Sequence, residues 1–235
     1  YAATVMTVKV PVKVPAGNFA MGFFYDDKKK TLEGIPTVAM DSSSITLATR
    51  HFSRFFVSSI EGEKLTGDII DSGFWASRDD WQFENGSTGL IGGRCSGMSA
   101  TAIWYFYEKP DGPAAHLYGR YDGTDGRQTP ATWQDDAQAI RLTTSVQADY
   151  EDRGIAMERQ FRDMMKLSDD ITVKEFAYSI LVTGGPQMIQ LPRHSMVATG
   201  VSGNKILISD PNYPGELRAS EWRNGKLEYQ YDETL

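Results

Sequence analysis

The hydrophobic period of the chain changes twice along its length, and this change constrains the fold more than any other feature. Residues 7–14 and 44–49 alternate apolar and polar side chains, the period of a half-buried strand. Helical periodicity follows in the middle of the chain, at residues 96–108, 131–149, 152–166 and 172–181. After Gly184-Gly185 the strand patterns return, at residues 187–191, 194–201, 205–209, 217–222 and 227–231. Helices followed by antiparallel strands predict an α+β domain.

The N-terminal part is expected to form a small all-β, sandwich-like module over residues 1–61. Strand patterns at residues 19–25 and 52–57 add to the two already named, and turn signals separate them. The module is short for a complete sandwich, which leaves open that further strands precede it. Residues 58–73 contain charges, glycines and few large apolar side chains, so we place a domain boundary near residue 62 and a second domain at residues 62–235.

Composition excludes several classes of function. The net charge of −7 and the pI of about 5.0 argue against a nucleic-acid partner. No apolar run is long enough to cross a bilayer, so no membrane-spanning segment is expected. One cysteine and three widely separated histidines provide neither a disulfide nor a recognisable metal motif, and we expect no metal and no cofactor. Residues 122–126 (DGTDG) lack the full ligand series of a calcium loop and are interpreted as a solvated turn.

The single cysteine, Cys95, lies between a glycine-rich turn and an apolar run. Gly92-Gly93 precedes it, and residues 100–106 (ATAIWYF) have the composition of a buried helix. Cys95 is therefore predicted to lie in the first turn of a helix, where unpaired N–H groups and the helix dipole stabilise a thiolate. The alternative is an inert buried thiol, which is the common state of a free cysteine.

A histidine and an aspartate are predicted to meet at the open end of a hairpin. His194 begins one strand, a turn at Gly203-Asn204 reverses the chain, and Asp210 follows the returning strand. A carboxylate beside an imidazole fixes its tautomer and stabilises the imidazolium. Taken singly, His194 could be an edge-strand histidine and Asp210 the start of an Asp-Pro turn. His116 is followed by no strand-end acid and is the weaker candidate base.

Two further pairs of residues are expected to have structural roles. Trp81 and Trp104 flank Cys95 in sequence and are expected in the core rather than as a substrate platform. Thr172 and Glu175 match a capping box, which predicts that a helix begins there.

The order of Cys95 on a helix, His194 on a strand and Asp210 sixteen residues later resembles the papain-like cysteine peptidase superfamily. The most similar branch is the bacterial one that resembles bacteriocin-processing peptidases. The resemblance covers about residues 75–235 and rests on the segments 185–191, 194–197 and 206–212. It implies an α+β fold in two lobes, in which the cysteine helix faces a β-sheet that carries the histidine.

One position departs from the papain-like pattern. The family has a glutamine about six residues before the nucleophile, which donates to the oxyanion, and Gly89 stands at that position here. Asn85 and Gln82 are the upstream amides that could take the role. We favour Asn85, because the Asn85-Gly86 turn could direct its side chain towards Cys95, although an ordinary Asn-Gly turn explains it equally well. The Cys95 backbone N–H is expected to be a second donor.

The resemblance implies a cysteine peptidase that cleaves peptide or isopeptide bonds through an acyl-enzyme, with a peptide or protein as substrate. Two alternatives stay open: an acyltransferase of transglutaminase or amidase type with the same triad, and a catalytically inactive surface binding or adhesion module. Residues 49–53 (TRHFS) resemble the end of β modules in large bacterial surface proteins, so we expect a secreted or bacterial cell-surface protein. A monomer is expected.

Overall fold

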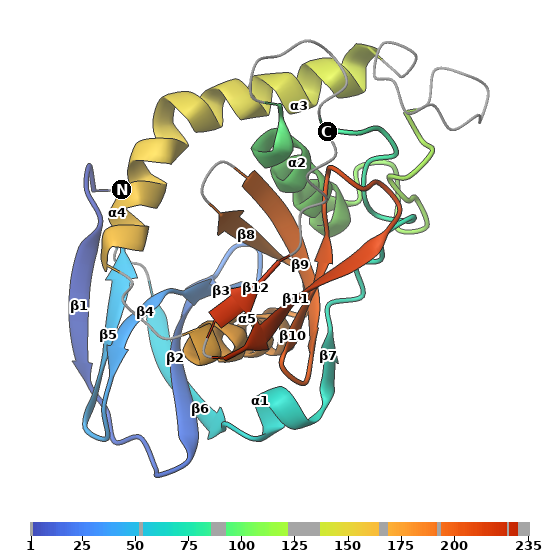
Figure 1. The fold of residues 1–235 in the computed structure, drawn as a ribbon. Helices are drawn as coiled ribbons and strands as arrows, with labels where there is room; N and C mark the ends of the chain where they lie inside the picture. Colours follow the sequence, from blue (N-terminus) through green and yellow to red (C-terminus); the bar gives the residue numbers. More distant parts are fainter. Residues whose placement is uncertain are drawn as a thin grey trace.

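The structure is a computed structural model that describes residues 2–51, 54–85, 93–121, 137–164, 169–191, 194–224 and 226–229. This part of the chain contains five α-helices and three antiparallel sheets (Figure 1). The predicted α+β class is therefore confirmed.

Two three-stranded sheets make up the N-terminal part. One has the order β1 (Met6–Pro11), β5 (Ser44–Thr49), β4 (Thr37–Met40), and the other β3 (Thr31–Ile35), β2 (Asn18–Asp26), β6 (Phe55–Glu61). Three of the four expected strands are present. The fourth, predicted at residues 52–57, is displaced to β6. Strands β3 and β4 were not expected, because each is short and neither has a long alternating pattern.

Short elements fill the segment that was predicted to be a boundary. Helix α1 (Lys64–Gly67) and strand β7 (Ile69–Asp71) lie there, and β7 pairs with the C-terminal half of β9 (His194–Ser202). The segment thus extends the C-terminal sheet instead of serving only as a linker.

The C-terminal sheet adds four strands to β7 and β9: β8 (Gln187–Leu191), β10 (Lys205–Ser209), β11 (Leu217–Arg223) and β12 (Lys226–Glu228). Its strand order is β12-β11-β10-β9-β7, and β8 also pairs with β9. Strands β8 and β7 follow one another along the same edge of β9, while β10 covers the other edge. The expected strands at residues 187–191 and 205–209 are confirmed.

Helix α2 (Cys95–Glu108) packs on one face of this sheet and is crossed by α3 (Ala137–Asp149). The crossing is close, because a Cβ on Gly97 would lie 2.0 Å from the Thr143 carbonyl oxygen. A π-helical segment, η2 (Tyr150–Gly154), joins α3 directly to α4 (Ile155–Met164). Two separate helices at 131–149 and 152–166 were expected, whereas residues 137–164 form one continuous helical segment. Residues 131–136 and 165–166 lie outside the described residues.

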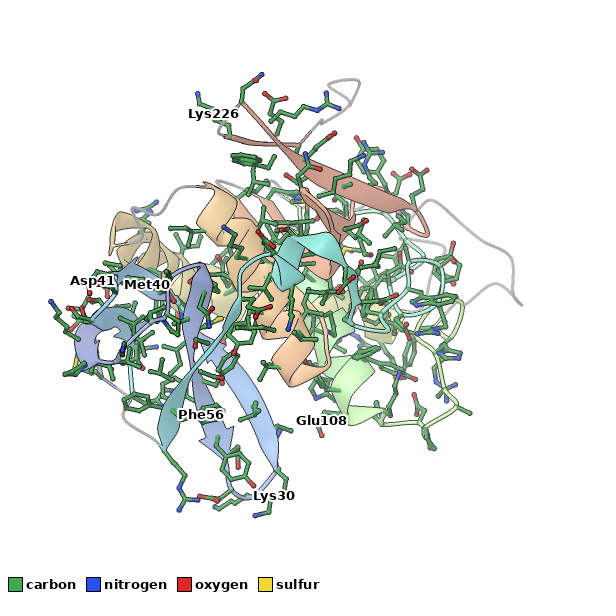
Figure 2. The ribbon with its side chains drawn as sticks, turned by 90° about the horizontal axis from the view of Figure 1, so that it is seen from below. Lys30, Met40, Asp41, Phe56, Glu108 and Lys226 are labelled. Carbon is green, nitrogen blue, oxygen red and sulfur yellow. The ribbon has the colours of Figure 1, made fainter. Side chains whose placement is uncertain are left out.

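The continuous helical segment α3-η2-α4 curves from α2 to the N-terminal strands (Figure 1). At its far end, the Val5 backbone N–H donates to the Gln160 side chain at 2.9 Å. Lys29 also pairs with Glu108 at 2.9 Å, and Figure 2 shows the hairpin tip at Lys30 on the same side as Glu108, near the bottom of that view. The N-terminal part thus contacts both α4 and α2.

Helix α5 (Asp169–Thr183) lies between the N-terminal strands and the C-terminal sheet. One apolar core contains Phe23 from β2, Tyr178 from α5 and Ile206 from β10. The expected capping box is wrong, because α5 begins at Asp169 and Glu175 reaches across to the Thr37 backbone N–H at 2.7 Å. The division of the chain near residue 62 stays a prediction.

The two tryptophans near Cys95 differ in environment. Trp81 is buried and donates its indole N–H to Thr101 at 3.0 Å, as expected of a core residue. Trp104 is 46% exposed, so its expected core role is wrong. His51 stacks on Phe24 with ring centroids 4.0 Å apart. None of the helices in the described ranges is long and apolar enough to cross a membrane.

Candidate active site

Cys95 is the first residue of α2, as the glycine-rich approach predicted. Gly93 turns the chain into the helix with a φ of +72°, and Arg94 accepts the first helical hydrogen bond from Met98 at 2.9 Å. The thiol therefore lies at the positive end of a fourteen-residue helix, and its residue is 4% exposed.

The structure brings His194 and Asp210 into contact at the open end of the β9-β10 hairpin. The distance from His194 Nε2 to Asp210 Oδ1 is 2.7 Å. The turn at Gly203-Asn204 is also as predicted, because Ser202 pairs with Lys205 across it. The predicted contact between the two side chains is therefore confirmed.

A β-bulge in β9 decides the face on which Asp210 lies. Leu207 pairs with Gly200 and Ile208 pairs with Ala198, so Thr199 has no partner in β10. Continued by one residue, this register places Asp210 opposite Met196, on the face that carries His194. Without the bulge Asp210 would continue opposite Val197, on the other face, because a slip of one residue reverses the side-chain pattern of a strand.

The pKa values of the cysteine and the histidine move in opposite directions. Burial tends to raise the pKa of the Cys95 thiol, but the hydrogen bond to His194 and the imidazolium charge outweigh burial and lower it. Burial tends to lower the pKa of His194, but the hydrogen bonds to Asp210 and Cys95 raise it to about 9. Both shifts favour a thiolate beside an imidazolium. Since Asp210 binds Nε2, Nδ1 is the ring nitrogen left for the thiol.

Asp210 has two partners that the sequence did not predict. The Asn212 backbone N–H donates to its Oδ1 at 2.8 Å, and the Tyr229 hydroxyl donates to Oδ2. Burial tends to raise the pKa of Asp210, but the hydrogen bond and charge of His194, helped by these two donors, lower it. The carboxylate therefore stays ionised beside the imidazolium. Tyr229 was missed because only a predicted strand at 227–231 marks it in the sequence.

Of the two amides considered for the oxyanion, Asn85 lies beside Arg94, which precedes Cys95, and beside Asn212, which follows Asp210. Its Oδ1 accepts a hydrogen bond from the Arg94 backbone N–H, and its Nδ2 donates to Asn212 Oδ1 at 2.9 Å. A Cβ on Gly93 would lie 2.7 Å from Asn85 Oδ1, so this approach requires glycine. The Gln82 side chain instead lies beside Gly119. Gly89 lies outside the described residues.

A chain of hydroxyl and amide groups connects α2 to the sheet next to Cys95. The Ser96 and Ser195 hydroxyl oxygens are 2.6 Å apart, and Ser195 donates to Gln190 Oε1 at 2.6 Å. Tyr150 donates to the same Gln190 oxygen at 3.1 Å. A backbone hydrogen bond from Ser195 also contributes to the lowered pKa of Cys95. The helix start is thereby fixed against the strand that carries His194.

Two adjacent aspartates hold the loops around the site. Asp80 accepts backbone N–H bonds from Ser77 and Gly215, both at 2.8 Å, and so fixes the loop that follows Asp210. Burial raises its pKa to about 6. His116, the weaker candidate base, has its Nδ1 3.5 Å from Asp79 Oδ1 and takes no part in the Cys95 cluster.

Arg94 is a buried cation directly before the thiol. It is 1% exposed, and its Nε and Nη1 atoms have no hydrogen-bond partner among the residues that the structure describes. Burial lowers its pKa. Burying N–H groups of a guanidinium without hydrogen-bond partners costs free energy, so we expect Arg94 to lower the stability of the folded chain.

No group of three or more histidine, cysteine, aspartate or glutamate side chains could hold a metal ion in the part of the chain that the structure describes. The turn at residues 122–126 lies outside that part. No protein-family model, no curated protein and no solved structure matches the chain. The site must therefore be interpreted from its own geometry.

Proposed function

We propose that the chain is a papain-like cysteine peptidase that uses Cys95, His194 and Asp210. The observation that carries the proposal is the connected series of contacts at one end of the C-terminal sheet: thiol to imidazole, and imidazole Nε2 to carboxylate at 2.7 Å. The lowered pKa of Cys95 and the raised pKa of His194 both favour the thiolate–imidazolium pair that nucleophilic catalysis needs.

In the proposed reaction the Cys95 thiolate attacks the carbonyl carbon of a peptide bond. The carbonyl oxygen becomes an oxyanion, for which the Cys95 backbone N–H and the Asn85 amide are the candidate donors. His194 then gives its Nδ1 proton to the leaving amine while Asp210 stabilises the imidazolium. Water, deprotonated by His194, releases the acyl group and restores the thiolate.

The first experiment measures the reactivity of the thiol. Because Cys95 is the only cysteine, the mass increase of the intact chain after iodoacetamide treatment reports this residue alone. We expect a rate that is nearly independent of pH around neutrality, since pairing with His194 lowers the pKa of Cys95 and favours the thiolate. A free thiol, with a pKa of about 8.5, would react faster with each step in pH.

The matched variants are His194→Ala and His116→Ala. The first removes the imidazolium and should restore the pH dependence of a free thiol, while the second, paired with Asp79, should leave the rate unchanged. A wild-type rate that follows a free thiol would contradict the proposal and favour the inactive binding module.

The second experiment separates hydrolysis from acyl transfer. Peptide mixtures are incubated with the chain, with and without an added primary amine, and the products are identified by mass. Cleaved peptides that disappear with Cys95→Ala support a peptidase, and amine-coupled products alone would support the acyltransferase. The secreted or cell-surface location and the monomeric state stay predictions.

A further inference from the structure

A cavity of about 780 Å³ lies on the face of the C-terminal sheet opposite to α2. Its walls come from α5, from the strands that carry Met196 and Ile208, and from the N-terminal strand residue Met21. Tyr150 and Phe161 of the η2-α4 segment also line it. Its volume is within the range of sites that hold small molecules, about 300–1,000 Å³.

Most of the wall is apolar. Ile189, Ile206 and Leu227 contribute from the sheet, and Phe176 contributes from α5. The cavity is separate from the thiol, because neither Cys95 nor His194 is among its described lining residues. Its nearest link to the site is Tyr229, which lines the cavity and donates to Asp210.

Glu175 is the only charged side chain among the described residues that line the cavity. It is 7% exposed, and its Oε1 accepts the Thr37 backbone N–H at 2.7 Å. The described residues provide no ion pair to it. Lys174, its neighbour in sequence, lies beside Gly62 on another side of α5. A buried carboxylate whose described donors all belong to the neutral Thr37 needs a cation to be stable in its ionised form.

We propose that this cavity is a binding site for a small amphipathic molecule with an apolar tail and a protonated amine that pairs with Glu175. The apolar walls match the tail, and the single carboxylate determines the charge of the head group. A carboxylate head group would be repelled by Glu175. A neutral head group would leave the carboxylate without a counter-charge.

The test uses decylammonium, decanoate and decanol as probes, in calorimetric titrations of the whole chain at about pH 8. We expect decylammonium to bind saturably and at least about tenfold more tightly than the other two. Glu175→Gln should weaken decylammonium binding about tenfold. The matched control Glu33→Gln removes one acidic charge from an exposed position on β3 and should leave the affinity unchanged.

Two filling variants test the location. Met188→Trp and Leu227→Trp add volume to cavity walls on different strands, and each should abolish binding while circular dichroism shows a folded chain. Equal binding of decanoate would show an apolar pocket without charge selection and would overturn the proposal. Lack of saturable decylammonium binding by the wild type, or full binding by folded filling variants, would also overturn it. Neither result depends on the peptidase activity.

Discussion

Glu175 should make the protein less stable as the pH rises, and Glu175→Gln should remove this effect. Burial raises the pKa of Glu175 from 4.5 to about 7, although the Thr37 backbone N–H partly opposes the shift. The folded state therefore retains a proton that the unfolded chain releases between about pH 4.5 and pH 7. Because the folded state binds more protons in this window, the free energy of unfolding falls as the pH rises.

The magnitude follows from the two pKa values. One pKa unit corresponds to about 1.4 kcal/mol. A pKa of 4.5 in the unfolded chain and about 7 in the folded protein therefore lowers the free energy of unfolding by about 3 kcal/mol above pH 7. Glutamine keeps the acceptor for the Thr37 N–H and does not titrate. We expect Glu175→Gln to match the wild type near pH 4.5 and to exceed it by about 3 kcal/mol near pH 8.

The assay is urea unfolding of both proteins at the two pH values, followed by circular dichroism. The difference in free energy of unfolding between the wild type and the variant cancels the contributions of the other groups that titrate in this range, such as Asp80 with its pKa of about 6. Glu33→Gln, an exposed charge change on β3, serves as the control and should give the same difference at both pH values. An equal difference for Glu175→Gln at both pH values would refute the reasoning.

Three further substitutions test separate parts of the site. Asp210→Asn should lower the pKa of His194 from about 9, so the pH-insensitive range of alkylation should end at a lower pH. Asn85→Ala should lower kcat for peptide cleavage by about 10²–10³ if its amide binds the oxyanion. The iodoacetamide rate should change little, because alkylation forms no oxyanion. Arg94→Met should raise the free energy of unfolding by about 1–3 kcal/mol in urea titrations, since it removes a buried guanidinium whose Nε and Nη1 have no hydrogen-bond partner among the described residues.

The sequence predicted the parts of the site that depend on local signals. A glycine-rich turn before an apolar run predicted the helix that begins at Cys95, and a two-residue turn between two strands predicted the neighbourhood of His194 and Asp210. Features that depend on tertiary contacts were missed. Tyr229 reaches Asp210 only because β12 follows β11 back across the sheet, and Glu175 bonds to Thr37, 138 residues away.

The bulge at Thr199 shows why a correct contact prediction can rest on an incomplete argument. An unbroken hairpin would bring Asp210 near His194 along the strand but on the opposite face of the sheet. The backbone that holds the bulge comes from the segment interpreted as a boundary: the Ser72 backbone N–H and hydroxyl both donate to the Thr199 carbonyl, at 2.9 Å and 2.6 Å. Strand β7 places Ser72 there by pairing Asp71 with Gly200. The contact between His194 and Asp210 thus depends on a three-residue strand whose sequence, Ile-Ile-Asp, is too short to carry a periodic signal.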